Sequence, residues 1–237
     1  MTSMSDLQLL QLQAEALFTH DGRGRILHTN EPEGDRAPRF FFAHSREGNL
    51  WRCRDDVPKE MVRALDALAA AEPVGVDLRA EPRNVGAFLT ALGVEREGAP
   101  VESGPAYQFP DELPRAAGVT HLTRDNLHLL RAMVQDLDYT ARYFEERGPC
   151  MAVVEDGRAV SICFSARLTD KAAEAGVETL EAYRGRGYAP AVVTEWARAI
   201  RATGRIPLYS TSWDNHASQA VARRFRLVHY GTDVSLG

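Results

Sequence analysis

Hydrophobic positions recur along the chain at spacings typical of alternating helices and strands. In the first half, helical periodicity predicts helices over residues 7–17, 59–71 and 85–92. The turn at Arg46–Asn49 lies between two aromatic-rich flanks and predicts a hairpin. The turn at Asp21–Gly24 is compatible with two structures: a hairpin, or a helix that runs through a turn into a strand.

The second half alternates between the two periodicities more regularly. Asp156-Gly157 separates two apolar runs, and this dipeptide is a strong signal for a β-hairpin. Strands are predicted over residues 119–123, 150–154, 159–166, 173–180, 206–211 and 227–234. Helices are predicted over residues 125–137, 140–146, 188–203 and 215–225. The pattern indicates an α+β fold.

A segment rich in glycine and proline, residues 97–114, predicts the boundary between two domains. The length of 237 residues also favours two units. We therefore expect a smaller N-terminal α+β domain over residues 1–114 and a second domain over residues 115–237.

Composition narrows the class of protein. The net charge of -5 is mildly acidic, which argues against a nucleic-acid partner and suits a cationic amine substrate. Cys53, Cys150 and Cys163 are far apart and form no CxxC pair, so neither a disulfide framework nor a metal site is expected. The first residues do not resemble a leader, and no run of about 18 apolar residues occurs, which predicts a cytoplasmic protein without a membrane span.

A glycine-rich turn between a predicted strand and a predicted helix carries the clearest chemical signal. Gly185 and Gly187 leave the backbone uncovered, and Arg184 and Arg186 add positive charge. Amide groups at the start of a helix, together with its dipole, favour an anion there. Pro190 breaks the pattern of a dinucleotide fingerprint, and no Gly-Lys-Ser/Thr of a Walker loop occurs, so the anion is expected to belong to a different cofactor.

The segment from Val177 to Ala189 resembles the acetyl-CoA motif of the GNAT superfamily of N-acetyltransferases. The family signature Gln/Arg-x-x-Gly-x-Gly/Ala is met by Arg184, Gly187 and Ala189. The order of predicted elements over residues 119–234 also matches, and Asn215 opens a segment similar to the second cofactor segment of the family. The resemblance implies a mixed, mostly antiparallel sheet flanked by helices.

The resemblance also implies an enzyme that transfers an acetyl group from acetyl-CoA, its co-substrate, to an amine of a small molecule or a peptide by direct attack. Under this hypothesis the N-terminal domain, residues 1–114, shapes the site of the acceptor amine. The backbone of the strand is then expected to follow the pantetheine arm, and the loop amides are expected to hold the pyrophosphate. The implied cofactor-binding residues are Val177, Glu178, Thr179, Arg184, Gly185, Arg186, Gly187, Tyr188, Ala189 and Asn215.

The catalytic residues are less clearly marked, because Ala222 stands where many members have a tyrosine that acts as general acid. Glu174 and Glu178 share a parity on one strand, so either could remove a proton through water; solvated surface carboxylates are the alternative. Ser210 is a third candidate, at the acyl site. A non-catalytic acyl-CoA-binding sensor is the competing function, and a homodimer is compatible with the sequence.

Overall fold

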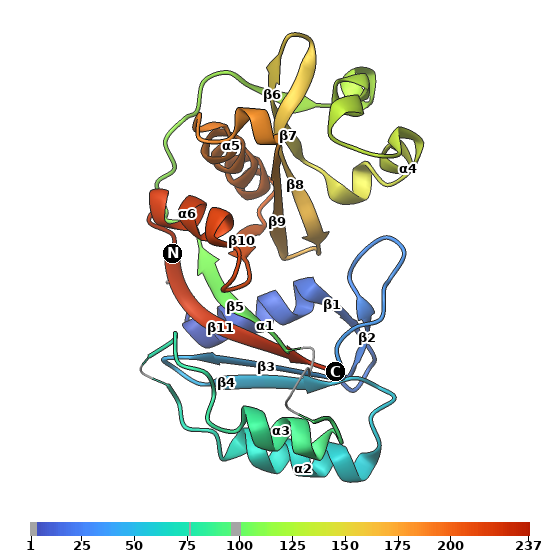
Figure 1. Ribbon diagram of the computed structural model, residues 1–237, viewed down its shortest axis with the longest axis vertical. Coiled ribbons are helices and arrows are strands. Elements are labelled where there is room, and N and C mark those ends of the chain that lie inside the picture. Colours follow the sequence, from blue (N-terminus) through green and yellow to red (C-terminus); the bar gives the residue numbers. More distant parts are fainter. Residues whose placement is uncertain (1–3, 76, 96–100) are drawn as a thin grey trace. The chain divides into compact units, whose positions relative to one another are not determined.

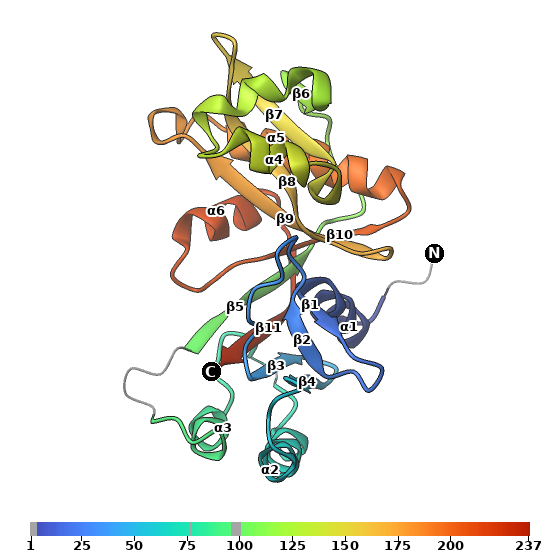
Figure 2. The same ribbon diagram turned by 90° about the vertical axis from the view of Figure 1, so that its right-hand side faces the viewer.

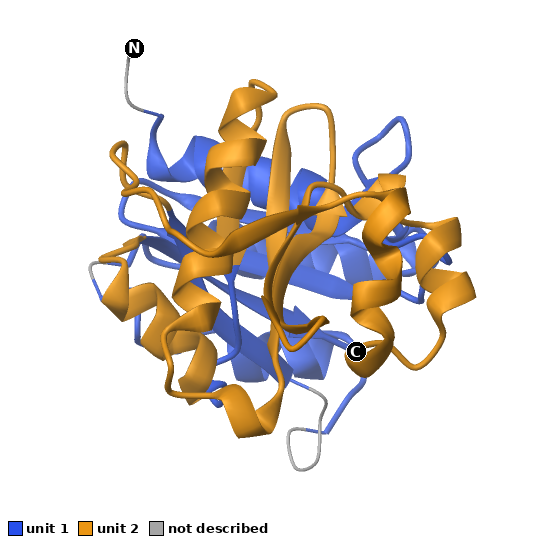
Figure 3. Cartoon of the chain, turned by 90° about the horizontal axis from the view of Figure 1, so that it is seen from above, with its two compact units in different colours: residues 1–108, 210–215, 229–237 blue, residues 109–209, 216–228 orange. Residues whose placement is uncertain are grey.

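The chain divides into two compact units that are interleaved along the sequence (Figure 1; Figure 3). A computed structural model describes residues 4–75, 77–95 and 101–237. The first unit comprises residues 1–108, 210–215 and 229–237, and the second comprises residues 109–209 and 216–228. The chain therefore passes from the first unit to the second, back to the first at residues 210–215, again to the second, and ends in the first.

The first unit is an α+β structure with four strands in the order β4-β3-β11-β5 and a separate β1-β2 hairpin. Strand β3 pairs antiparallel with both β4 and β11. Its elements are α1 (Asp6–Leu17), β1 (Phe18–His20), β2 (Ile26–Thr29), β3 (Phe40–Ser45), β4 (Asn49–Cys53), α2 (Lys59–Ala70), α3 (Val85–Ala91), β5 (Val101–Gln108) and β11 (Val228–Leu236). The three predicted helices are confirmed, and the turn after Asp21 belongs to a hairpin.

Alternation along β3 distributes three consecutive phenylalanines to the two faces of this sheet. Phe40 and Phe42 pack on Phe88 of α3, with ring centroids 5.0 and 5.3 Å from it. Phe41 points to the other face, where its ring lies 5.2 Å from that of Phe18. Both faces of β3 are therefore buried, which explains why the strand begins with four consecutive apolar residues, 40–43.

The segment expected to be a boundary is not irregular throughout. Residues 101–108 form strand β5, whereas residues 97–100 lie outside the described part of the chain. Gly104 explains the glycine in this strand, because a Cβ there would overlap the carbonyl oxygen of Thr211. A glycine that contributed to the boundary prediction therefore permits close contact between two backbones.

The second unit is a mixed sheet with helices on both faces. Its strands run in the order β10-β9-β8-β7-β6; neighbours pair antiparallel except β10 and β9, which are parallel. The elements are β6 (Val119–Leu122), η1 (Arg124–Ala132), α4 (Leu137–Arg142), η2 (Glu145–Arg147), β7 (Cys150–Glu155), β8 (Arg158–Leu168), β9 (Ala172–Thr179), η3 (Glu181–Tyr183), α5 (Tyr188–Ala202), β10 (Ile206–Ser210) and α6 (His216–Arg224). The predicted fold class, a mostly antiparallel sheet flanked by helices, is confirmed.

The helices of this unit separate into two groups. Helix α5 lies against one face of β7, β8 and β9, and η1, α4 and η2 lie on the other (Figure 1; Figure 2). Trp196 of α5 is fully buried and donates a hydrogen bond to the Ser165 hydroxyl of β8 at 3.2 Å. The buried face of this helix is therefore its contact with the sheet.

The predicted helix over residues 125–137 differs from the structure in type and bounds, and the predicted helix over residues 140–146 differs in its bounds. The first is a 3-10 helix that ends at Ala132, with a non-helical backbone at Asn126. A new helix then begins at Leu137, because the Asp136 side chain accepts a hydrogen bond from the amide of Tyr139 and caps it. The sequence predicted a break between two helices at residues 138–139, whereas the break lies at residues 133–136.

None of the helices in the described residues is both long enough and apolar enough to cross a membrane.

Candidate functional site

The glycine-rich turn leads directly into α5. Gly185 and Gly187 have φ values of +77° and +84°, in the left-handed region that disfavours other residues. Gly187 is the N-cap residue of α5, and no side chain caps the helix there. Both glycines are therefore required by the backbone path, and they leave the start of the helix accessible.

The backbone amides of this turn are not used by the fold. Within the described residues, the amides of Gly185 through Ala189 donate no hydrogen bond, and the first helical one runs from the amide of Ala191 to the oxygen of Gly187. Pro190 has no N–H to give. Five consecutive amides at the positive end of a 15-residue helix fit the phosphate groups of a nucleotide-type cofactor.

Arginine side chains around the turn have different environments. The Arg186 guanidinium donates to the oxygen of Ala182 at 3.2 Å and lies over the ring of Tyr183, 4.8 Å from its centroid. Arg184 is exposed. Arg224, from the last turn of α6, approaches within 3.9 Å of the position that a Cβ on Gly187 would occupy. Sequence analysis missed Arg224, because only the fold brings α6 to the turn.

The Tyr188 hydroxyl is already engaged in a hydrogen bond within the protein. Its hydroxyl donates a hydrogen bond of 2.5 Å to the Glu155 carboxylate, and this bond raises the pKa of Tyr188. Only the backbone amide of Tyr188 is then available to an anion at the turn.

Strand β9, which leads to the turn, has one open edge. Its parallel pairing with β10 ends at Glu174, opposite Leu208, whereas its antiparallel pairing with β8 continues to Thr179. In the described part of the chain, residues 175–179 are therefore paired on the β8 side alone. Residues 177–179 present a free backbone edge, as the predicted contact with an extended cofactor arm requires.

The structure separates the two candidate carboxylates on β9. Glu174 is only 2% exposed and lies opposite Arg167 beyond an irregularity in the pairing of β8. Glu178 lies opposite Ile162, and both side chains line a cavity on the helical side of the sheet. Glu178 is thus the carboxylate that faces a space large enough for a ligand group.

This cavity has a volume of about 130 Å³ and lies between β7, β8 and β9 and the covering helices. Its lining is mainly aliphatic and aromatic. The lining residues are Leu130, Val134, Tyr139, Thr140, Tyr143, Phe144, Arg147, Cys150, Ile162, Phe164 and Glu178. Of these residues, sequence analysis proposed only Glu178 as a site residue. The others come from several elements, and their convergence depends on packing that the sequence pattern does not reveal.

The ionisation of Glu178 and Cys150 in the cavity depends on burial and on neighbouring charges. Desolvation raises the pKa of Glu178, and the positive charge of Arg147 lowers it in part. Burial, with a smaller contribution from Glu178, raises the pKa of Cys150 to about 12. The thiol is therefore protonated at neutral pH and is a poor nucleophile.

The remaining predicted site residues lie elsewhere. Ser210 ends β10 and Asn215 is exposed in the turn before α6; both belong to segment 210–215 of the first unit. Ala222 is 1% exposed within α6, so no hydroxyl is available at the position of the family's usual tyrosine. The roles of Ser210 and Asn215 stay predictions.

The second unit is an α+β domain with a mostly antiparallel sheet. Its strand β9 is followed by a turn whose backbone amides are unpaired in the described residues, and α5 begins at that turn. This arrangement suits an anionic cofactor. The family model described as GNAT acetyltransferase matches residues 113–228, and these residues belong to that family. The predicted family and the predicted class of enzyme, an acyltransferase, are confirmed by this match. Acetyltransferases of this family use acetyl-CoA.

Solved structures show more distant likenesses. A GNAT-family acetyltransferase from Colwellia psychrerythraea is 14% identical, with 100% of this chain and 98% of that chain covered and a TM-score of 0.49. A protein from Novosphingobium aromaticivorans DSM 12444, assigned to the same family, is 20% identical, with 57% of this chain and 64% of that chain covered and a TM-score of 0.45. The chain thus spans less than two thirds of that protein's length.

The aminoglycoside N-acetyltransferase AAC(6')-Iy, in complex with CoA, is 18% identical, with 45% of this chain and 88% of that chain covered and a TM-score of 0.38. These likenesses carry no argument about the substrate. No significant match was found among curated proteins.

Proposed function

We propose that the chain transfers the acetyl group of acetyl-CoA to an amine by direct attack. One observation carries this proposal: strand β9 places Glu178 at the cavity and continues into the turn whose amides are free. A proton acceptor and an anion-binding site therefore lie on one segment. Acetyl-CoA supplies an acetyl group that is activated as a thioester.

Each part of the segment has a distinct task in the proposed reaction. The amides of residues 185–189, with Arg224 nearby, hold the pyrophosphate. The free edge of residues 177–179 orients the cofactor arm. Glu178 accepts the proton of the amine, directly or through water, and the apolar cavity excludes bulk water from the amine.

The environment of Cys150 supports direct attack over a covalent enzyme intermediate. A nucleophilic cysteine must be a thiolate, and burial keeps this thiol protonated. Direct attack needs no nucleophilic side chain. The amine must lose a proton and lie near the thioester, and an enzyme meets both requirements by holding the amine close to a proton acceptor and to the cofactor.

A sensor that binds acyl-CoA without turnover is the second candidate. The buried Ala222 favours it, because α6 offers no tyrosine hydroxyl to protonate a departing thiolate. Release of free thiol in the presence of an amine separates the two functions: an enzyme releases CoA, whereas a sensor only binds it. The predicted acceptor-shaping role of residues 1–114, the homodimer and the cytoplasmic location stay predictions.

The test of the proposed function is Gly187→Glu, which places a carboxylate where phosphate is expected to bind. We expect calorimetric titration to show loss of acetyl-CoA binding in this variant, together with loss of thiol release. Gly204→Glu is a matched control: Gly204 lies at the other end of α5, with a φ of +82° and no neighbour within 4 Å of the position that a Cβ would occupy. Both substitutions impose similar backbone strain, of about 1–2 kcal/mol.

The control therefore separates strain from blocked binding. Gly204→Glu is expected to lower the melting temperature by a similar amount and to retain acetyl-CoA affinity. Normal acetyl-CoA binding by a folded Gly187→Glu protein would show that the turn is not the pyrophosphate site.

A further inference from the structure

The cavity beside Glu178 combines an apolar lining with two opposite charges. Nine of its eleven lining residues carry no formal charge, and the two exceptions are Arg147 and Glu178. The two charges are close enough to interact, because Arg147 lowers the pKa of Glu178. A ligand that matches this lining needs an apolar group, a cationic group and an anionic group.

The size of the cavity limits the apolar group. Ligand pockets usually enclose about 300–1,000 Å³, whereas this cavity encloses about 130 Å³. At roughly 30 Å³ for each water molecule in the liquid, the space corresponds to about four waters. It therefore fits a single aliphatic or aromatic side chain and is too small for an oligosaccharide or a folded peptide.

In the described residues, the Arg147 guanidinium interacts with Glu178 only through their charges and forms no salt bridge or hydrogen bond with an acidic group. Its carbon lies 5.7 Å from the centroid of the Phe164 ring, and its Nε is buried without a hydrogen bond there. Unpaired buried polar atoms are rare, because each costs about 1–3 kcal/mol. A guanidinium presents a planar fork that matches a carboxylate, so an incoming carboxylate would satisfy Arg147.

Glu178 supplies the complementary charge on the strand that leads to the cofactor turn. A carboxylate at this position attracts an ammonium group and can then take its proton. The amine is thereby placed on the side of the cavity nearest the predicted cofactor arm, while the carboxylate of the same ligand is held by Arg147.

We propose that the acceptor is a free α-amino acid with an apolar side chain, its carboxylate on Arg147, its amine at Glu178 and its side chain in the cavity. This inference rests on the proposed function, because it specifies the substrate of the same reaction. A peptide, whose first residue has no free carboxylate, would leave Arg147 without its partner.

The proposed transfer is balanced without a further reactant. Glu178 takes one proton from the ammonium group and leaves a neutral amine. The nitrogen forms a bond to the acetyl carbonyl carbon as the bond between that carbon and sulfur breaks. The nitrogen then loses its second proton, directly or through water, to the departing thiolate. The products are an N-acetyl amino acid, free CoA and the proton held by Glu178, which water removes.

The first experiment compares three acceptors that share one side chain: L-leucine, L-leucinamide and isoamylamine. Thiol release from acetyl-CoA is measured with the full-length protein, and glycine serves as the acceptor without a side chain. We expect kcat/KM for L-leucine to exceed that of each of the other three at least tenfold. Equal or better use of leucinamide or isoamylamine would overturn the proposal.

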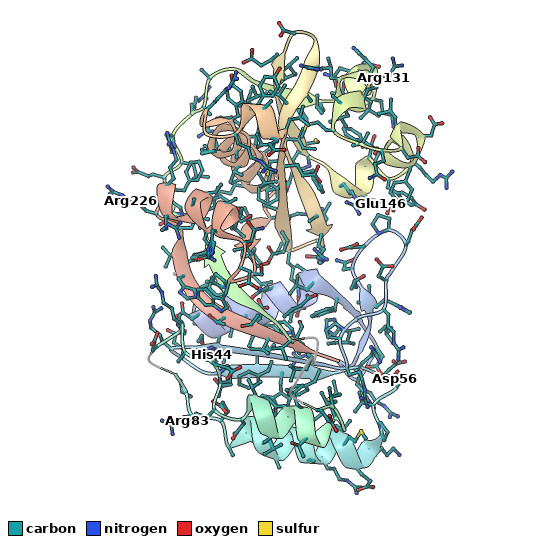
Figure 4. All side chains as sticks on the ribbon, viewed as in Figure 1. His44, Asp56, Arg83, Arg131, Glu146 and Arg226 are labelled. Carbon is teal, nitrogen blue, oxygen red and sulfur yellow. The ribbon has the colours of Figure 1, made fainter. Side chains whose placement is uncertain are left out.

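The second experiment removes the predicted carboxylate site. Arg147→Gln is expected to lower kcat/KM for L-leucine at least tenfold more than kcat/KM for leucinamide, with both acceptors compared at a pH above the rise of both rate profiles. Arg131→Gln is the matched control, since Arg131 is an exposed arginine on the neighbouring η1 that does not line the cavity (Figure 4). Arg147→Lys, which keeps the charge without the fork, replaces the variant if Arg147→Gln does not fold.

Acetyl-CoA binding separates failure of this inference from failure of the proposed function. Calorimetry on the same preparations is expected to show unchanged acetyl-CoA affinity in Arg147→Gln. If acetyl-CoA binds and thiol is released with other amines while L-leucine is not preferred, only the acceptor assignment is wrong. If the wild-type protein neither binds acetyl-CoA nor releases thiol, the proposed function is wrong, and the acceptor assignment with it.

Discussion

Glu178 combines a position in the cavity with a carboxylate that is a stronger base than an exposed one. Desolvation by the cavity raises its pKa, and Arg147 opposes part of that increase. A carboxylate with a raised pKa holds a proton more readily, which suits a general base that works near neutral pH.

Glu178→Gln is expected to lower kcat/KM by about 100-fold, the lower end of the range for general acid–base catalysis. In the wild type, kcat/KM is expected to rise with pH as Glu178 loses its proton, and the variant is expected to lack this rise. Arg147→Gln removes a positive charge, so the pKa of Glu178 increases and the rise moves to higher pH. Rate profiles over pH measure both effects.

Two carboxylates serve as controls for this prediction. Glu174→Gln changes the other candidate on β9, which is buried and does not line the cavity, so we expect the pH profile to keep its position. Glu146→Gln removes an exposed charge next to Arg147 in the sequence (Figure 4) and is expected to change neither rate nor profile. A wild-type pH profile in Glu178→Gln would exclude Glu178 as the base.

At the scale of elements, α1 and β11 of the first unit are linked by a polar contact in an apolar environment. The Gln13 side chain donates to the Asp233 carboxylate at 2.8 Å, and the Tyr230 hydroxyl donates to the Gln13 oxygen at 3.3 Å. Desolvation raises the pKa of Asp233 to about 7 from 3.8, although Gln13 lowers it in part. The fold therefore favours the protonated acid.

This contact predicts that the first unit loses stability as pH rises from about 4 to about 7. The unfolded chain loses the Asp233 proton near pH 4, whereas the folded chain keeps it to about pH 7. The difference between the folded and unfolded pKa of Asp233 corresponds to at most roughly 4 kcal/mol of unfolding free energy, at 1.36 kcal/mol for each pKa unit. Asp233 is partly exposed, and solvent screening reduces this free energy. Asp233→Asn is expected to raise the melting temperature at pH 8.

Thermal unfolding from pH 4 to pH 8 measures this effect in both proteins. The wild type is expected to show the decline in stability, and Asp233→Asn is expected to show a smaller one, since asparagine does not titrate. Parallel curves for the two proteins would mean that other groups cause the pH dependence.

Elements were predictable wherever one periodicity or one turn signal dominated locally. The hairpin at Asp156-Gly157 is an example: both residues have positive φ, as the dipeptide predicts. Local signals said less where a distant contact decided the structure. Gly104 was part of the glycine and proline pattern that predicted a boundary, yet it lies in β5, where the backbone at Thr211 approaches it closely. No local signal reveals a neighbour more than 100 residues away.

The same distinction applies to the candidate site. The turn at Gly185 and Gly187 was recognisable because its function depends on consecutive backbone amides, which a short sequence motif specifies. Arg147 and Arg224 were not recognisable, because the first depends on how η2 packs on the sheet and the second on where α6 ends. Side chains that converge from separate elements leave no spacing pattern in the sequence.

At the scale of the whole molecule, the last strand belongs to the first unit. Strand β11 lies between β3 and β5, although residues 109–209, most of the second unit, precede it in the chain. The family match ends at residue 228, where β11 begins. Strand β11 therefore lies almost wholly outside the family match, and it completes the sheet of the first unit.

Leu236→Ala tests this division, because Leu236 is 0% exposed at the end of β11. Loss of a buried leucine costs about 2–5 kcal/mol, a large share of the 5–15 kcal/mol typical of domain stability. Hydrogen exchange is expected to accelerate at least about tenfold in β3 and β4 while β7 and β8 keep their protection. Val228→Ala, at a position 46% exposed in the same strand, is expected to change neither. Equal acceleration in both units would mean that they unfold together, because β7 and β8 do not pair with β11 and would otherwise keep their protection.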